Sequence, residues 1–224
     1  MLALGDELVP PDAPLAPGQI RVNNLYAITA SVIKYGGEGH NLGIARDDLD
    51  MVQGALGQAS DADLLVTLGG SQRGDFDLVD DLLSGARGHI IFREVAVNYA
   101  RSMIFGPFGS IPLFGLPGSP MAAFVAFEAF VRPAIWKLGG RRILEAPRAE
   151  AVLTEPLPAT TTRAHFQPVW VEYGPEGLTA VPLRVEKAVD LPPQTLANGL
   201  VYRLPGSQAC QAGERVWVEL VEGV

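Results

Sequence analysis

Residues 63–77 read DLLVTLGGSQRGDFD, and the fold class follows from this stretch. Its first part, 63–68, is a continuous apolar run that a charged residue opens and the pair Gly69-Gly70 closes. Such a run is typical of a strand buried on both faces of a parallel sheet. A short helix is predicted directly after it, over 77–84. The stretch therefore predicts a glycine-rich loop beyond the carboxyl end of a buried strand, which is where open α/β sheets bind ligands.

Strands and helices alternate on both sides of this stretch, as far as about residue 138. A helix expected within 20–35 has four apolar residues on one face: Leu25, Ile28, Val32 and Ile33. Before the stretch we expect a proline-rich ordered loop at 5–18, a strand at 39–44 and a helix that Asp47 or Asp48 caps and that runs to about residue 57. After it we expect extended segments at 89–92 and 95–97, a strand at 111–114 and a long apolar helix at 119–138 that Pro133 bends. The alternation predicts a doubly wound, mostly parallel α/β domain over residues 1–140.

The pattern changes after the glycine–arginine segment at 139–142. Short β-branched runs follow, broken by proline and glycine: VWVEY, LTAVPL, LVYRL and ERVWVEL. Runs of this length and composition favour a small all-β fold, a barrel or a sandwich. We expect a β-barrel domain over residues 146–224.

Composition excludes several classes of protein. The net charge of −8 argues against non-specific nucleic-acid binding, which needs a basic surface. No apolar run is long enough to span a membrane, and the first 20 residues do not have the pattern of a signal peptide. Cys210 is the single cysteine, so no internal disulfide can form and a cytoplasmic location is expected. The three histidines are far apart and do not have metal-ligand spacing.

The loop at 69–77 is the first candidate site. Its glycines let backbone N–H groups approach an anion, and the following helix start favours negative charge. Arg73 adds a cation, and Asp75 and Asp77 could hold a divalent metal or hydroxyl groups. The alternative is an ordinary strand–helix turn with Asp77 as the N-cap.

A second glycine turn, GLPGSP at 115–120, also joins a buried strand to a helix. Ser119 suits the N-cap and Pro120 the first helical position, so a well-capped helix is the alternative interpretation. Two such turns that leave neighbouring strands would converge on one pocket. This convergence favours a ligand site.

Two further groups carry polar chemistry. Asp6 and Glu7 lie in the proline-rich loop, and Asn24 lies at the start of the first long helix. Arg101 follows the extended segment at 95–97 and could bind a phosphate or oxyanion through two hydrogen bonds. The alternatives are a solvated acidic pair and a surface arginine.

Together these residues resemble the molybdopterin molybdenumtransferase family, which includes the E domain of gephyrin. The resemblance rests on LGDEL at 4–8, GQI at 18–20, GIARDD at 43–48, AD at 62–63, the loop at 69–77 and GLPGSP at 115–120. Their order and spacing match the family over residues 4–138. Residues 145–224 match its C-terminal β domain more weakly, through ANGL at 197–200 and AGE at 212–214.

The resemblance implies that the chain inserts molybdate into adenylated molybdopterin with release of AMP, and that it uses a divalent metal, commonly Mg²⁺. By position it implies four catalytic residues, Asp77, Asp47, Glu7 and Arg101, with Asp77 and Glu7 at the metal. The ligand-binding residues it implies are Asn24, Gly69, Gly70, Ser71, Arg73, Gly74, Asp75, Pro117, Gly118, Ser119 and Pro120. The remoter alternative is a different nucleotide-handling enzyme of the same fold, such as the amidase-linked family.

The chain departs from the family at its cations. The family's KPGK is NYAR at 98–101, and another family lysine is Glu94 here. The serine of the family's glycine loop is Gln72, and the asparagine of GLPGNP is Ser119. Because lysines supply most of the charge complementarity of an anion site, these losses support a non-catalytic or degenerate molybdopterin-binding protein as the alternative function.

The resemblance also implies two further N-terminal domains and a partner subunit that completes the site. Residues 1–4 correspond to a truncated first strand, so we expect a misplaced start, a truncated gene or a separate chain that supplies the rest. A homodimer is expected once those domains are present.

Overall fold

The computed structural model describes residues 1–70, 78–85, 88–175, 177–185 and 195–221. These form two compact units. The first consists of Met1–Val95 and Ala100–Leu144, and the second of Ala96–Tyr99 and Glu145–Val224. An α/β fold with a parallel-rich sheet and a following β-barrel are both present, which confirms the predicted fold class.

The first unit is built on a five-stranded sheet in the order β4-β1-β5-β7-β6. Its strands are β1 (Leu2–Leu4), β4 (Ile44–Ala45), β5 (Leu65–Leu68), β6 (Ile104–Phe108) and β7 (Ile111–Leu116). The predicted central strand is confirmed, because β5 pairs in parallel with both β1 and β7 and all four of its residues are buried. The edge strand β6 runs antiparallel to its neighbour.

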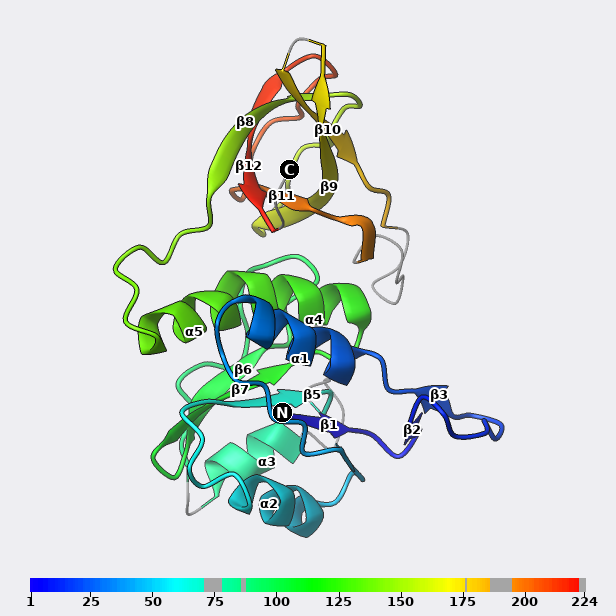
Figure 1. Ribbon diagram of the computed structural model, residues 1–224, viewed down its shortest axis with the longest axis vertical. Helices are drawn as coiled ribbons and strands as arrows, with labels where there is room; N and C mark the ends of the chain where they lie inside the picture. The colour runs from blue at the N-terminus through cyan, green and yellow to red at the C-terminus, as the bar shows by residue number, and fades with distance from the viewer. Residues whose placement is uncertain (71–77, 86–87, 176, 186–194, 222–224) are drawn as a thin grey trace. The chain divides into compact units, whose positions relative to one another are not determined.

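Helices cover both faces of this sheet, as Figure 1 shows. One face carries α1 (Asn24–Lys34) and the continuous run of α4 (Pro120–Ala126), η1 (Phe127–Val131) and α5 (Arg132–Leu138). The other face carries α2 (Leu49–Gly57) and α3 (Leu78–Ser84). Of the two aspartates that could cap α2, the structure selects Asp48, whose Oδ1 accepts a hydrogen bond of 2.9 Å from the Met51 N–H.

The helix predicted within 20–35 is shorter than expected at its N-terminus. Ile20–Arg21 form strand β3, because the Ile20 N–H donates to the Glu7 carbonyl instead of starting a helix. The placement of Ile33 on the buried face was wrong, since this side chain is 60% exposed. At about 100° per residue, the position after Val32 has already turned away from the sheet.

The long helix at 119–138 is confirmed, and its irregularity has a local cause. Residues Phe127–Val131 form a π-helical turn in which the Arg132 N–H bonds the Phe127 carbonyl, five residues earlier. Pro133 follows at once and has no N–H to continue an α-helical ladder. All seven residues of α4 are buried, as expected for a helix between layers.

The strand β6 was not predicted, and the extended segments at 89–92 and 95–97 do not form strands. They make isolated bridges instead, Phe92 to Phe105 and Val97 to Ala164. Gly106 in β6 is needed for this arrangement, because a Cβ there would overlap the His89 carbonyl.

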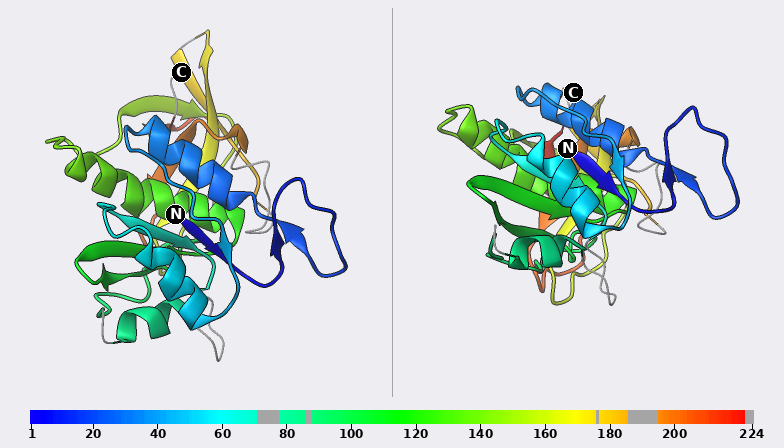
Figure 2. Two further views of the ribbon diagram at one scale, coloured as in Figure 1. Left: turned by 60° about the horizontal axis from the view of Figure 1, so that its bottom comes forward. Right: turned by 90° about the horizontal axis from the view of Figure 1, so that it is seen from below.

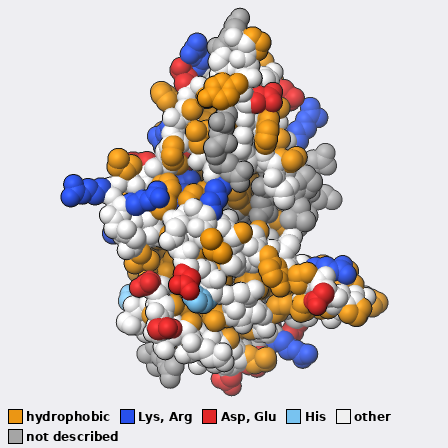
Figure 3. Space-filling view, in the orientation of Figure 1, with side chains coloured by type: hydrophobic (Ala, Val, Ile, Leu, Met, Phe, Trp, Pro, Cys, Tyr) orange, Lys and Arg blue, Asp and Glu red, His pale blue; other side chains and the backbone are white. Residues whose placement is uncertain are grey.

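The proline-rich stretch forms an arm rather than only a loop. Strands β2 (Leu8–Val9) and β3 pair in parallel at its base. The Arg21 Nε donates a 2.8 Å hydrogen bond to the Pro11 carbonyl and holds the arm together. Figure 2 shows the arm extending away from the sheet, and Figure 3 shows apolar side chains on its surface, which include Leu15 at 48% exposed.

The second unit is a closed barrel in the order β10-β8-β12-β11-β9. Its strands are β8 (Arg148–Leu153), β9 (His165–Gly174), β10 (Gly177–Pro182), β11 (Gly199–Arg203) and β12 (Arg215–Leu220). Strands β10 and β8 pair in parallel. Closure of the sheet decides between the two all-β folds that the sequence allowed, in favour of the barrel.

Within the described ranges, no helix has the length and apolar character that crossing a membrane requires.

Candidate functional site

The predicted site residues that the structure describes lie at the carboxyl edge of the parallel sheet. Parallel strands bring their carboxyl ends to the same edge, where ligands bind in open α/β folds. Strand β1 leads there into Asp6 and Glu7, and β4 leads into Asp47. Strand β5 leads into Gly69, and β7 leads into Pro117.

The two glycine turns lie side by side, as predicted. The Gly69 N–H donates a 3.0 Å hydrogen bond to the carbonyl of Leu116, the last residue of β7. A Cβ added to Gly118 would lie only 3.4 Å from the Gly69 Cα. The backbones of the two turns are therefore in contact. Because this contact uses the Gly69 N–H, the N–H groups beyond Gly69 are the ones that the turns can present to one anionic ligand.

Gly69 and Gly70 are required by their conformation and by the neighbouring strand. Their φ values are +93° and +67°, which L side chains rarely adopt. A Cβ on Gly69 would lie 2.6 Å from the Leu4 carbonyl oxygen, and one on Gly70 would lie 2.7 Å from the Leu4 Cδ1. The glycine pair thus lets the loop lie directly against the end of β1.

Asn24 connects helix α1 to the second turn. Its Nδ2 donates a 2.6 Å hydrogen bond to the Gly118 carbonyl, across 94 residues of sequence. The side chain is buried, and its Oδ1 has no hydrogen-bond partner among the described residues. Asn24 was predicted to bind ligand, and the structure places one end of its amide on the turn that would do so.

Ser119 has the backbone conformation of an N-cap, with Pro120 at the first helical position, as the sequence predicts. Its hydroxyl makes no capping hydrogen bond. The Ser119 side chain therefore does not stabilise the helix by capping. Its hydroxyl can contact a ligand beside Pro117 and Gly118.

Thr67, which the sequence motifs did not indicate, lies under the same two turns. It is fully buried in β5, and its Oγ1 has no hydrogen-bond partner in the described part of the chain. A Cβ on Gly115 would lie 3.5 Å from this oxygen. The signal was present in the sequence, because threonine is the one polar residue within the run LVTL.

Three carboxylates gather beside the glycine turns. The Asp47 N–H donates to the Asp6 Oδ1 at 3.4 Å, although 41 residues separate them. Burial, and then the negative charges of Asp6 and Glu7, raise the pKa of Asp47 above its usual value. The Glu7 carboxylate lies against Gly5, the residue after β1, since a Cβ on Gly5 would lie 2.6 Å from the Glu7 Oε2.

This acidic group does not by itself form a protein cage for a metal. No set of three or more His, Cys, Asp or Glu residues within the described segments could hold one. Magnesium in phosphate-handling sites is commonly held by one or two carboxylates, with substrate phosphates and water as the other ligands. The negative charges of Asp6 and Glu7 help to raise the pKa of Asp47, and a divalent cation would offset this repulsion. The donor set therefore fits magnesium bound together with a phosphorylated substrate.

Arg101 also belongs to the carboxyl edge. Ile104 at the start of β6 pairs with Gly115 at the end of β7, so the residues just before β6 lie at this edge. The Arg101 Nε is 3.5 Å from the Glu94 Oε2, and both side chains are about two-fifths exposed, at 41% and 40%. The cation at this position is therefore paired with the acidic residue that stands where the resemblance has a lysine.

Part of the predicted site lies outside the described residues. The predicted site residues that lie there are Ser71, Arg73, Gly74, Asp75 and Asp77. Gln72, which replaces the serine of the family's glycine loop, lies there as well.

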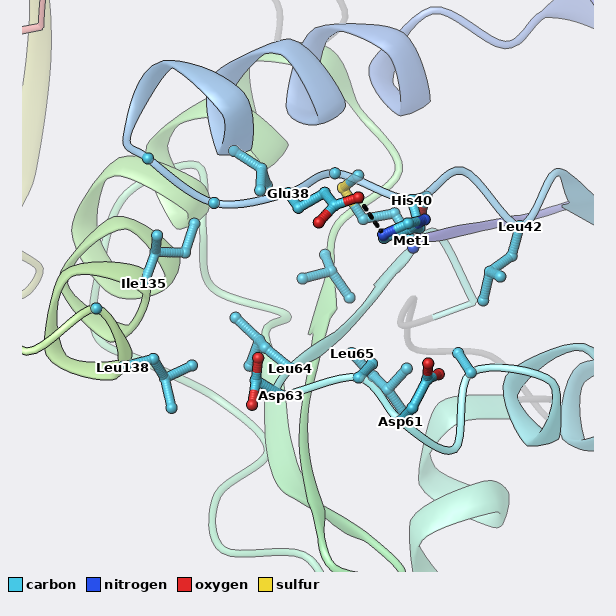
Figure 4. Close-up of a pocket in the computed structure, with 18 of the residues that line it drawn as sticks. Met1, Glu38, His40, Leu42, Asp61, Asp63, Leu64, Leu65, Ile135 and Leu138 are labelled. Atoms are coloured by element: carbon cyan, nitrogen blue, oxygen red, sulfur yellow. Dashed lines mark hydrogen bonds and ion pairs between the residues drawn. The ribbon is translucent and has the colours of Figure 1, made fainter.

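A separate cavity of about 580 Å³ opens at the opposite, amino-terminal edge of β1 and β5 (Figure 4). Glu38, His40, Asp61 and Asp63 are among its lining residues, and the His40 Nε2 is 3.2 Å from the Glu38 Oε1. None of the predicted site residues lines it. The candidate site is consequently the open carboxyl edge and not this cavity.

Comparisons with known proteins identify the family to which the chain is similar. The chain is 31% identical to a molybdopterin molybdenumtransferase of Bacillus subtilis, over 99% of the chain and 52% of the relative. It is 38% identical to a molybdopterin molybdenumtransferase of Nostoc, over 62% of the chain and 33% of the relative. The crystal structure of a molybdopterin biosynthesis MoeA protein from Pyrococcus horikosii superimposes with a TM-score of 0.83 at 29% identity, covering 100% of this chain and 54% of that one.

The chain thus spans about half the length of the Bacillus relative. Residues 1–137 match the family model of the probable molybdopterin binding domain. That range includes all five strands of the sheet and both glycine turns. The chain therefore belongs to the family of probable molybdopterin-binding domains.

Proposed function

We propose that this chain acts in molybdenum cofactor biosynthesis and inserts molybdate into adenylated molybdopterin, with release of AMP. The observation that carries the proposal is the convergence of two glycine turns and three carboxylates at the carboxyl edge of the sheet. The names of the Bacillus and Nostoc relatives support the reaction. In it, water cleaves the phosphoanhydride of the substrate and AMP leaves. The two dithiolene thiols replace one oxygen of molybdate, which leaves as water that carries their two protons.

The glycine turns would bind the anionic part of the substrate. The backbones of Gly69, Gly70 and Gly118 can approach a phosphate closely, and the Ser119 hydroxyl can donate to it. Asn24 would hold the turn that bears Gly118. The segment with Ser71, Arg73, Gly74 and Asp75 would complete this contact on the side of β5, and Pro117 and Pro120 would shape the other side.

We place magnesium beside Glu7 and Asp47, with Asp77 as a third carboxylate. When bound there it would act as a Lewis acid on the phosphate oxygens. Asp47 gains most from such a cation, because burial and its two acidic neighbours disfavour its ionised form. Glu7 would contact the cation beside Gly5, at the end of β1. Arg101 would bind an anionic oxygen of the substrate.

We further propose a homodimer in which a partner subunit completes the site when further N-terminal domains are present. A cytoplasmic location is proposed as well. Its support is Cys210, the only cysteine, which is free and partly exposed, as is usual in a reducing compartment.

The second candidate function is a molybdopterin-binding protein without transfer activity. One observation favours it, the pairing of Arg101 with Glu94, which neutralises the cation that should hold the oxyanion. The named relatives favour the transferase.

The test is an anaerobic molybdenum-insertion assay on the purified chain, with AMP release as the readout and molybdopterin binding measured by calorimetry. We expect the chain to bind molybdopterin and to transfer molybdenum slowly. The double variant with Glu94→Lys and Asn98→Lys should accelerate transfer, whereas Glu145→Lys, the same exchange as at Glu94 but at an exposed position after α5, should not. A fusion to the N-terminal half of a relative tests the contribution of the additional domains. Absence of molybdopterin binding by both the chain and the fusion would refute the proposed function.

A further inference from the structure

Tyr99 has a backbone conformation that its residue type disfavours. Its φ is 67°, and no other non-glycine residue in the described part of the chain has a positive φ. In this left-handed region the Cβ lies too close to the backbone for most L residues. Such a conformation persists only where surrounding contacts impose it, and such residues cluster at functional sites.

Contacts within the second unit impose the conformation of Tyr99. Val97 forms a parallel bridge with Ala164, and the Asn98 N–H donates a 2.8 Å hydrogen bond to the Ala164 carbonyl. The Tyr99 ring lies against the ring of His165, with 5.6 Å between centroids and an angle of 55° between planes. Burial and the charge of Arg203 lower the pKa of His165, which keeps this ring neutral at pH 7.

The same segment is part of a short closed loop. The Val95 N–H donates a 3.1 Å hydrogen bond to the Arg101 carbonyl, so residues 95–101 return to their starting point. Residues Ala96–Tyr99 group with the barrel unit, whereas Val95 and Ala100 group with the α/β unit. The chain turns back at Tyr99, the last residue before it rejoins the α/β unit at the fully buried Ala100. The left-handed conformation of Tyr99 makes that turn.

We propose that Tyr99 is a positioning residue for Arg101. Its left-handed backbone and its ring contact with His165 close the loop at 95–101 and so determine where the Arg101 guanidinium meets an anionic oxygen of the ligand. The inference rests on the proposed function, because it takes the ligand to be molybdopterin.

The placement of Arg101 matters because two acceptors compete for it. Glu94 lies at the base of the same loop, with its Oε2 3.5 Å from the Arg101 Nε. At that distance the pair is loose, since charge-assisted hydrogen bonds between N⁺–H and O⁻ are about 2.7–2.9 Å long. A small shift of the loop therefore decides whether the guanidinium contacts Glu94 or the ligand.

Two measurements on the full chain test the proposal. The first is hydrogen exchange at the Val95 amide, which reports loop closure without any ligand. The second is the dissociation constant for molybdopterin, measured anaerobically by calorimetry. Tyr99→Ala and His165→Ala should both accelerate Val95 exchange and weaken binding about tenfold, as expected when a charged hydrogen bond is misplaced.

The conservative variant and the control separate positioning from general damage. His165→Phe keeps a ring against Tyr99 and should retain wild-type exchange and affinity. Tyr173→Ala removes the same side chain from an exposed place on β9, at 77% exposed, and should change neither measurement. Because His165→Phe and His165→Ala leave Tyr99 in place, they test the contact even if Tyr99→Ala does not fold.

Arg101→Ala decides between a positioning and a merely structural role. If Tyr99 acts through Arg101, Tyr99→Ala should cause no further loss of molybdopterin affinity in the Arg101→Ala background. Equal losses in both backgrounds would overturn the proposal, as would unchanged Val95 exchange in Tyr99→Ala. Failure of the wild-type chain to bind molybdopterin would instead refute the proposed function and the ligand role of Arg101, and the exchange measurement would still decide whether Tyr99 closes the loop.

Discussion

Replacement of Gly69 by alanine tests whether contact between the glycine loop and β1 shapes the site. The added Cβ would lie 2.6 Å from the Leu4 carbonyl oxygen. Ordinary contact begins at 3.4 Å, so either the loop or the carbonyl must move by about 0.8 Å, which is 3.4 minus 2.6. Leu4 is buried in β1 between two other strands, and the loop should therefore be the part that moves.

Two magnitudes follow for Gly69→Ala. The positive φ of +93° and the contact together should cost about 1–3 kcal/mol of stability. A domain with about 5–15 kcal/mol of total stability remains folded after such a loss. A displacement near 1 Å in a binding site can reduce activity on the order of 10²-fold. We therefore expect a folded variant whose molybdopterin affinity and AMP release fall by roughly one to two orders of magnitude.

Two glycines serve as graded controls. Gly54 lies in α2, and an added Cβ there would have nothing within 4 Å, so Gly54→Ala should stabilise the helix by about 0.5–1 kcal/mol and leave binding unchanged. A Cβ on Gly118 would lie 3.4 Å from the Gly69 Cα, at the limit of ordinary contact, so Gly118→Ala should have a much smaller effect than Gly69→Ala. Thermal unfolding measures the first quantity, and calorimetry with molybdopterin measures the second. Wild-type affinity in a folded Gly69→Ala variant would refute the claim that this contact shapes the site.

Three further predictions concern stability around the site. Asn24→Ala removes the 2.6 Å hydrogen bond to the Gly118 turn and should cost about 1 kcal/mol in thermal unfolding while weakening molybdopterin binding; unchanged binding would make Asn24 purely structural. Glu128→Gln removes the carboxylate that pairs with Arg132 at 2.8 Å and leaves the Arg132 charge, 4% exposed, without its ion pair. Calorimetry should show a loss of about 3–5 kcal/mol of stability. The double variant with Glu128→Leu and Arg132→Met should regain most of the lost stability. Asp47→Asn should stabilise the chain at pH 7, by at most about 1 kcal/mol because the side chain is exposed. The pKa of Asp47 is raised in the folded state, so the wild type loses stability as the pH rises through that pKa. The extra stability of Asp47→Asn should therefore disappear when unfolding is measured toward pH 3.8, the ordinary pKa of the group. Extra stability that does not depend on pH would contradict this prediction.

The sequence predicted best those strands that are buried on both faces and those helices that begin at a capping side chain. The run LVTL of β5 is buried on both faces, so its apolar character is continuous and easily recognised. Helix α2 has a capping aspartate at the predicted position. Four of the barrel strands, β9 to β12, contain the β-branched runs that predicted them, whereas β8 reads RAEAVL and was not among those runs.

The strand β6 escaped prediction because Gly106 and Pro107 interrupt it. An edge strand tolerates proline, because one side of its backbone has no neighbouring strand to bond. One signal could have revealed it: Gly109 and Ser110 separate β6 from β7 as a two-residue hairpin loop, and Gly109 has a φ of +64°. A loop of this kind between two apolar runs predicts paired strands on both sides.

Proximity in the site depends on register, which the sequence does not display. Asp47 reaches Asp6 because β4 pairs in parallel with β1, with Ala45 opposite Leu4. A shift of one residue would turn these side chains to the other face of the sheet. The pairing of Arg101 with Glu94 depends in the same way on closure of the loop at 95–101, which the hydrogen bond from Val95 establishes.

Charge at the carboxyl edge determines what the site needs in order to bind an anion. The described residues there include the carboxylates of Asp6, Glu7 and Asp47, while Arg101 already faces Glu94. An anionic substrate that approached this group alone would be repelled, and more strongly where water is excluded. Backbone N–H groups of the glycine turns offset part of that repulsion as fixed dipoles, but they carry no net charge. A divalent cation held by the carboxylates would change the sign of the local field, so the same residues that repel a bare anion would bind its magnesium complex. We therefore propose that the acidic group and the glycine turns are two halves of one site, so that binding of the substrate should require both.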